Sequence, residues 1–217
     1  MELPFPELMT TKGKILVVGA HPDDLEFGCG GFLRLLTRNG WQAHLLVLTG
    51  GEQGGDSAVR HREQERCAAF LGAKLYWGGF RDTEIPLDRR LIQLVDQRVQ
   101  AIEPDIMLTH FWDDTHQDHR AVSQACITAG RHLQSLLFYE GPSTVNFVPG
   151  TYADIGPVIN DKLKLMKLHS SQVNKTSVPH LSILESAKSV AIFRGHQNKC
   201  KYAEAFQPGR LSLTAFF

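Results

Sequence analysis

The chain has 217 residues, of which 42% are hydrophobic and 21% charged, so it can bury the core of one compact α/β domain. Lysine plus arginine and aspartate plus glutamate each number 23, and this balance gives no overall attraction to nucleic acid or to an anionic membrane. With no signal-peptide pattern at the start and no apolar run of about 18 residues, we expect a cytoplasmic protein with a single domain over residues 1–217.

Strands and helices are predicted to alternate along the first two thirds of the chain. The expected strands are 15–18, 43–49, 74–77, 104–109 and 136–139, and the expected helices run from 24 to a cap at Gly40 and over 59–71, 88–102 and 119–132. This alternation favours a parallel sheet covered by helices on both faces. Beyond residue 141 the pattern weakens to edge strands at 145–148 and 152–155 and helices near 161–168 and 178–193.

Two clusters of histidine and aspartate each follow a predicted buried strand. The first is His21-Pro22-Asp23-Asp24, and the second runs over residues 110–119. In open parallel sheets, the carboxyl ends of the strands form the crevice in which ligands bind. The two clusters are therefore expected to share one crevice.

The clusters contain the ligand types of a hydrolytic zinc site. Such a site takes three protein ligands of imidazole and carboxylate type and keeps a fourth position for water, and His21, Asp24 and His119 provide this set. The spacing of His21 and Asp24 can aim both side chains at one point, and Pro22 stiffens the turn between them. Zinc lowers the pKa of bound water from about 16 to about 7.

Three further residues of the clusters suit catalysis. Asp23 lies between two expected ligands and is the candidate general base. His116 can act as an acid or as a donor to an oxyanion, and Asp118 can fix its tautomer and favour its charged form. For each aspartate taken alone, a helix N-cap is the common alternative.

The remaining features predict no second site. The other histidines are expected in ordinary core or surface positions: His44, His61, His110, His132, His169, His180 and His196. Cys29, Cys67, Cys126 and Cys200 lack a Cys-x-x-Cys pair, so we expect four free thiols. Gly19 is followed by His21-Pro22 and not by further glycines, which argues against dinucleotide binding.

At these motifs the chain resembles the LmbE-like, or PIG-L, family of zinc-dependent N-acetylglucosaminyl deacetylases. The resemblance rests on residues 20–26 with the glycines at 28, 30 and 31, and on 116–119, 49–52, 60–63, 169–172 and 202–206. It implies a Rossmann-like fold with a smaller C-terminal strand and helix extension, and homo-oligomers. Gln117 departs from the proline that many members carry there, which removes no functional group.

The resemblance also implies roles for single residues. Zinc would bind His21, Asp24 and His119, with Asp23 as the base, and His116, tuned by Asp118, would stabilise the oxyanion and protonate the leaving amine. Arg60 would lie near the substrate, although a solvated helix start that pairs Arg60 with Glu63 is equally compatible with the sequence. His169 and Glu204 match family positions for which we expect structural roles.

The sequence therefore predicts a hydrolase that removes acetyl from an N-acetylglucosamine-type amino sugar or its conjugate. An amidase that acts on a larger acyl group or a thiol conjugate remains an alternative with the same centre. Two histidines and one carboxylate also suit a non-haem iron oxygenase, although no cosubstrate anchor is evident. A non-catalytic sugar- or nucleotide-binding module would leave Asp23 and His116 without a task.

Overall fold

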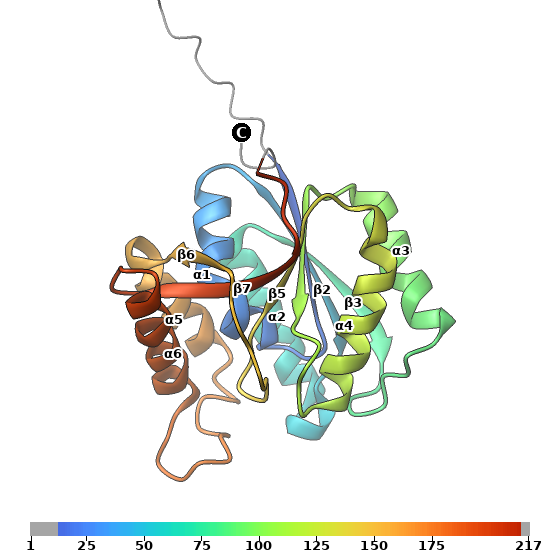
Figure 1. Cartoon of the computed structure of the whole chain (residues 1–217). Helices are drawn as coiled ribbons and strands as arrows, with labels where there is room; N and C mark the ends of the chain where they lie inside the picture. Colours follow the sequence, from blue (N-terminus) through green and yellow to red (C-terminus); the bar gives the residue numbers. More distant parts are fainter. Residues whose placement is uncertain (1–12, 214–217) are drawn as a thin grey trace, which may run out of the picture.

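A seven-stranded sheet lies at the centre of the computed structural model, which describes residues 13–213 (Figure 1). The strands are β1 Lys14–Gly19, β2 Gln42–Thr49, β3 Lys74–Phe80, β4 Ile106–His110, β5 Leu136–Tyr139, β6 Thr151–Asp154 and β7 Ala203–Arg210. The helices are α1 Asp24–Arg38, α2 Ser57–Leu71, α3 Arg89–Ile102, α4 Gln117–Ala129, α5 Ile159–Leu168 and α6 Ile183–Gln197. Short 3-10 turns are η1 Glu52–Gly54, η2 Gly130–His132 and η3 Gly156–Val158.

The strand order is β3-β2-β1-β4-β5-β7-β6, and the first five strands in this order pair in parallel. β7 runs antiparallel to β5, and β6 runs antiparallel to β7. The predicted parallel α/β sheet with a smaller C-terminal extension is therefore confirmed. Within residues 13–213, no helix is long and apolar enough to cross a bilayer.

Alternate residues along the inner strands pack into two separate hydrophobic cores, one on each face of the sheet. Leu16 and Val18 on β1 pack with α3 and α4 on one face, whereas Ile15 and Val17 pack with α1, α2 and α5 on the other. This alternation is the two-residue period of a strand whose two faces are both covered. Figure 1 shows α3 and α4 together on one side of the sheet and α1, α5 and α6 on the other. The four cysteines are free, as predicted.

The C-terminal region holds the corrections to the predicted elements. Residues 145–148 form no strand, and Val148 is 75% exposed. β7 was not predicted, because its sequence contains Pro208 and Gly209 and lacks the alternation of apolar side chains. Helix α6 begins at Ile183 and not at 178, since Ser182 and Glu185 form a capping box after Pro179.

Helix α1 begins in the first predicted cluster and contains a kink. Cys29 has non-helical dihedrals (φ −146°, ψ 17°), which divides α1 into two helical pieces. The Glu204 carboxylate on β7 accepts the Gly31 and Phe32 N–H groups at 2.8 and 2.7 Å, so it caps the second piece. At Gly28 a side chain would collide with the Tyr139 ring, and the glycine thus brings the start of α1 close to the sheet.

Candidate active site

The two predicted clusters lie side by side, because β1 and β4 are neighbouring parallel strands. The first cluster occupies the turn from β1 into α1. The second occupies the loop from β4 and the first turn of α4, where His119 lies. Both strands deliver their carboxyl ends to the same edge of the sheet, as expected for a ligand crevice in this class of fold.

His21, Asp24 and His119 converge on one point. His21 Nδ1 lies 3.3 Å from Asp24 Oδ2, and His119 Nε2 lies 3.5 Å from Asp24 Oδ1. The two ring nitrogens are 3.4 Å apart. A tetrahedral zinc with bonds of about 2.1 Å holds its ligand atoms about 3.4 Å from one another. The two carboxylate contacts reach different oxygens of Asp24, but one ligand atom from each of the three residues lies within 4.8 Å of the others, so the set fits a zinc site.

The electrostatics of this point favour a cation. Burial by itself lowers the pKa of His119, but the carboxylates of Asp24 and Asp114 outweigh it and raise that pKa to about 9. Burial raises the pKa of Asp24, yet His119 and His110 together hold it well below its usual range. Asp24 is thus ionised, and a positive charge between these side chains is stabilised.

Each of the two predicted ligand histidines presents its second ring nitrogen to a buried carboxylate. His21 Nε2 lies 2.9 Å from Asp82 Oδ1 and 3.2 Å from Asp118 Oδ2. His119 Nδ1 lies 3.3 Å from Asp114 Oδ1. Carboxylates in this position fix the ring orientation and tautomer of metal-binding histidines.

Asp82 and Asp114 received no role in the sequence analysis. Asp82 follows β3, so the rule that strands deliver ligands at their carboxyl ends could have indicated it. Asp114 lies within the second cluster, but no local spacing shows that it faces His119. His110, expected as an ordinary core histidine, is buried and also touches the centre: its Nε2 lies 3.2 Å from Asp24 Oδ2.

Asp118 bonds to the His116 ring through its backbone N–H, and its negative charge by itself raises the pKa of His116. The Asp118 carboxylate binds His21 and accepts the N–H groups of Thr83 and Ile85 at 2.8 and 3.2 Å. His116 occupies the N-cap of α4, where its Nδ1 accepts the Asp118 N–H at 3.2 Å. This bond leaves Nε2 of His116 as the protonated, donating nitrogen. Burial and the positive charges of His119 and His21 lower the pKa of His116.

Asp23 occupies the N-cap position of α1 without capping it. Its backbone is left-handed (φ 100°, ψ −24°), and its side chain makes no capping hydrogen bond. For a residue other than glycine such a backbone costs on the order of 1–3 kcal/mol and is common at functional sites. Burial raises the pKa of Asp23 to about 6, although the Arg60 guanidinium lowers it in part. A carboxylate with this pKa suits a general base at neutral pH.

Arg60 is buried at the start of α2 and holds the turn that carries Asp23. One terminal nitrogen, Nη2, donates to the Pro22 carbonyl at 2.6 Å and lies 3.3 Å from Asp23 Oδ2, while Nη1 donates to the Gly51 carbonyl at 2.7 Å. A solvated helix start is therefore wrong, because Arg60 is only 5% exposed. A role of Arg60 in substrate binding stays a prediction.

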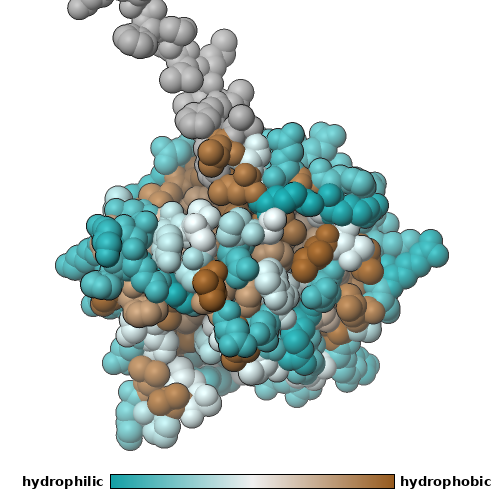
Figure 2. Space-filling model, in the orientation of Figure 1, coloured by the Kyte–Doolittle hydropathy of each residue, from teal (hydrophilic) through white to brown (hydrophobic). Residues whose placement is uncertain are grey.

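A cleft of about 700 Å³ opens beside Asp23. Its other walls come from Pro142 and from the segment between α5 and α6 with the first turns of α6. Apolar side chains such as Val178 and Leu181 alternate there with hydroxyls such as Thr176 and Ser177. Figure 2 shows hydrophobic side chains on the protrusion at the lower left, above its hydrophilic tip.

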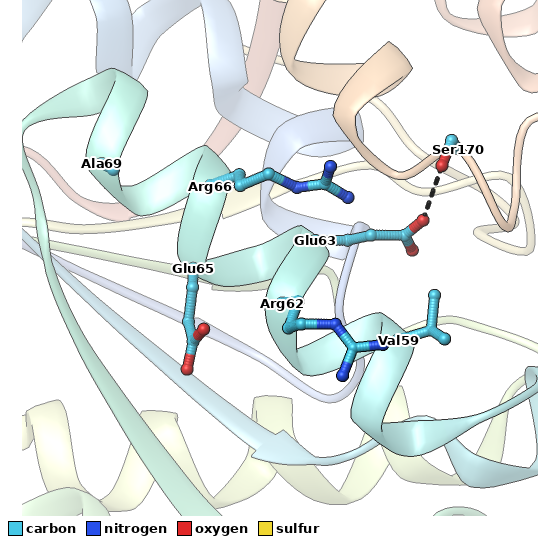
Figure 3. A pocket seen from close by; sticks show the side chains of 7 residues that line it. All are labelled: Val59, Arg62, Glu63, Glu65, Arg66, Ala69 and Ser170. Carbon is cyan, nitrogen blue, oxygen red and sulfur yellow. Dashed lines mark hydrogen bonds between the residues drawn. The ribbon is translucent and has the colours of Figure 1, made fainter.

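A second cavity, of about 500 Å³, lies along α2 and away from the ligand set. Figure 3 shows Arg62, Glu63 and Arg66 projecting into it from α2, with Ser170 on the opposite wall. None of the predicted catalytic or metal-binding residues lines this cavity. The cleft beside Asp23 is therefore the candidate substrate site.

Comparison with known proteins supplies the family. The family model described as PIG-L: GlcNAc-PI de-N-acetylase matches residues 16–130. An Escherichia coli (strain K12) protein named "Uncharacterized deacetylase YaiS" is 34% identical over 167 residues, which cover 72% of this chain and 90% of that protein. A diacetylchitobiose deacetylase of Thermococcus kodakarensis is 29% identical over 229 residues, which cover 90% of this chain and 84% of that enzyme.

Comparison with solved structures also gives a deacetylase of similar fold. The solved structure of N,N'-diacetylchitobiose deacetylase from Pyrococcus horikoshii, complexed with an inhibitor, superposes with a TM-score of 0.78 and 26% identity. The superposition covers 90% of this chain and 83% of that one. Since the family model spans more than half of the sequence and the bacterial relative exceeds 30% identity, the chain belongs to the PIG-L family of deacetylases.

Proposed function

We propose that this chain is a zinc-dependent N-deacetylase that hydrolyses the acetamide of an N-acetylglucosamine-type sugar or conjugate. The observation that carries the proposal is the convergence of His21, Asp24 and His119, whose ligand atoms all lie within 4.8 Å of one another, next to the half-buried Asp23 carboxylate. The names of the relatives, deacetylases of diacetylchitobiose among them, support this substrate class.

His21, Asp24 and His119 would hold the metal. When bound there, zinc would supply a Lewis acid that polarises the amide carbonyl and lowers the pKa of a neighbouring water molecule. The second-sphere carboxylates of Asp82, Asp114 and Asp118 would keep the two imidazoles oriented toward the ion.

Asp23 transfers the protons, and His116 stabilises the negative charge that forms on the carbonyl oxygen. Asp23 takes a proton from the attacking water, for which its pKa of about 6 is suited. His116 donates from Nε2 to the carbonyl oxygen as that oxygen gains negative charge. The leaving amine needs a proton, and protonated Asp23 can return the one it took. We prefer Asp23 to His116 for this step, because the pKa of His116 is lowered.

The cleft beside Asp23 suits an amino sugar together with its substituent. A sugar ring offers hydroxyls that can pair with the Ser177 hydroxyl and with the side-chain oxygen of Gln172, whereas an alkyl chain alone would offer these groups no partner on desolvation. The apolar side chains of Val178 and Leu181 can contact an apolar part of the substituent. This composition favours the deacetylase over an amidase that acts on a larger acyl group.

The test is acetate release from N-acetylglucosamine and its glycosides, measured on protein as purified, after chelation, and after zinc is restored. We expect turnover that disappears on chelation and returns with zinc. Asp23→Asn should lower kcat by about 10²- to 10⁴-fold with full zinc content, because the base is lost and the ligands remain.

Three outcomes separate the candidates. Release of amines only from larger acyl amides would replace the deacetylase by the amidase. Ligand binding without any hydrolysis, in protein shown to hold zinc, would point to the non-catalytic module and remove the roles of Asp23 and His116. Recovery of activity with iron and a cosubstrate, but not with zinc, would favour the oxygenase.

A further inference from the structure

Behind Asp23 lies a set of buried polar side chains that the proposed chemistry does not use. Glu26 on α1, Gln64 and Cys67 on α2, and His169 after α5 each have no exposed surface. Buried polar groups are costly unless they are paired, so such a set is retained for its contacts. The contacts lead from the interior to the backbone of the candidate base.

The contacts form one chain of donors and acceptors. The Asp23 N–H donates to Gln64 Oε1 at 3.3 Å, and Gln64 Nε2 donates to Glu26 Oε1 at 2.8 Å. The other carboxylate oxygen of Glu26 lies 3.1 Å from His169 Nε2. The orientation of the Gln64 amide follows from its neighbours, since an N–H requires an acceptor and a carboxylate requires a donor.

Gln64 and Arg60 hold Asp23 from two sides. They lie four residues apart on α2 and therefore on the same face of that helix. Gln64 accepts the Asp23 backbone N–H, while Arg60 Nη2 lies 3.3 Å from the Asp23 carboxylate. Rotation about φ changes the angle between the N–H and the side chain, so fixing both ends holds the left-handed conformation of φ 100°.

We propose that Gln64, supported by Glu26 and His169, is a positioning residue for Asp23 and keeps the carboxylate directed at the reacting water. This inference rests on the proposed function, in which Asp23 is the base. Gln64 itself touches neither the metal ligands nor, in the proposed reaction, the substrate, and acts only through the backbone of Asp23.

The same helix also positions the wall of the cleft. Figure 3 shows Glu63 on α2 directed at Ser170, whose hydroxyl donates to it at 2.9 Å. The Ser171 N–H donates to the same carboxylate at 2.8 Å, and the next residue, Gln172, lines the cleft. The same face of α2 therefore contacts both the turn that carries Asp23 and the segment that forms the wall of the cleft.

A buried metal site at Glu26, Cys67 and His169 is the competing interpretation of this cluster. Cys67 Sγ lies 3.3 Å from His169 Nε2 and 3.5 Å from the Leu165 carbonyl oxygen, as expected for a thiol within a hydrogen-bonded network. Burial raises the pKa of this thiol, which disfavours the thiolate that a metal needs. A measured content of two metals per chain would overturn the positioning role in favour of this site.

The test compares Gln64→Leu with Gln124→Leu, a matched change at an exposed position on α4. In the holoenzyme, Gln64→Leu should lower kcat by about 10- to 100-fold, because small displacements of a reacting group have effects of this size. KM and the zinc content should stay at wild-type values. Unchanged kcat, or a loss that follows only the unfolded fraction in thermal melts, would overturn the proposal.

A reciprocal exchange makes the test independent of a simple loss of packing. Gln64→Glu alone places two carboxylates together and should lower kcat, whereas the double variant E26Q/Q64E restores a donor and acceptor pattern with the charge moved by one side chain. We expect kcat to recover in the double variant. A double variant with kcat below both single variants would contradict the positioning role.

A second readout does not depend on turnover. The Asp23 amide should be protected from hydrogen exchange in the wild-type protein and exchange faster in Gln64→Leu, while amides in β1 stay protected. If the wild-type protein hydrolyses no amide, the proposed function fails, and this readout still decides whether Gln64 holds Asp23. Equal exchange of the Asp23 amide in both proteins would overturn the inference by itself.

Discussion

The parallel part of the sheet and its antiparallel edge both bury charged side chains, but they use them differently. At the carboxyl ends of β1 and β4, imidazoles and carboxylates from separate elements aim their ligand atoms at one point. In the antiparallel part, by contrast, Glu204 on β7 is paired with Lys162. Buried charge alone therefore does not identify a site in this protein. The candidate site is distinguished by ligand atoms that converge beside an open cleft.

The ion pair of Glu204 and Lys162 has a structural role. Glu204 is 4% exposed and caps the second piece of α1, while Lys162, 2% exposed, also donates to the Phe27 carbonyl oxygen. These contacts fasten α5 and β7 to the helix that carries Asp24. Glu204 thus has the structural role expected from the sequence. We therefore expect substitutions at the ends of β1 and β4 to affect catalysis and zinc binding, and substitutions around Glu204 to affect the stability of the fold.

The largest effect is expected at the metal ligands. His119→Ala should bring deacetylation below detection and lower bound zinc, because one of three protein ligands is lost. Metal analysis and acetate release measure both effects. The exposed His132 provides the control, and His132→Ala should keep zinc and turnover. Full zinc binding by the His119 variant would contradict the ligand set.

The next largest effect is on stability and belongs to the edge. Glu204→Leu leaves Lys162 buried without its partner and removes the cap of two α1 N–H groups. Breaking a buried ion pair in this way should lower the free energy of unfolding by about 3–5 kcal/mol. Denaturant unfolding measures the loss, with the exposed Glu84→Leu as the control. Turnover per folded molecule should change little, and a selective loss of zinc would place the edge within the site.

A smaller effect is expected at His116. Replacing it by alanine removes a donor to the carbonyl oxygen and should lower kcat by about 10²- to 10³-fold with zinc content unchanged. Steady-state kinetics with metal analysis test this. His196→Ala, at an exposed position on α6, should behave as wild type. A rise in KM alone would assign His116 to substrate binding and not to stabilisation of the transition state.

The smallest effect is expected in the carboxylates around the ligands, and two neighbours provide a matched pair. Asp114 lies 3.3 Å from His119 Nδ1, whereas the side chain of the half-buried Asp113 accepts a hydrogen bond from the Asn146 side chain. Asp114→Asn should weaken zinc binding by about 10- to 100-fold, as for other changes in the shell around metal ligands. Asp113→Asn should leave it unchanged. Competition with a chelator of known affinity measures both constants, and equal affinities would remove the role of Asp114.

Local pattern was sufficient to predict the alternating strands and helices, the parallel sheet and the two clusters of histidine and aspartate. Buried strands have short apolar runs, and helices have their own period and cap residues, so both can be recognised from neighbours in the chain. The rule that parallel strands present ligands at their carboxyl ends then brings His21, Asp24 and His119 together without knowledge of the packing. The motif resemblance led to the same residues.

Only the tertiary structure decided which partners these side chains have. The Asp118 carboxylate bonds to His21 while the Asp118 N–H bonds to the His116 ring, Asp82 reaches the centre from the loop after β3, and Gln64 holds the Asp23 backbone. β7 is a strand because it fits between β5 and β6, although its own residues do not favour one. Such contacts join residues far apart in sequence, and they depend on the packing of whole elements, for which a single sequence has no local pattern.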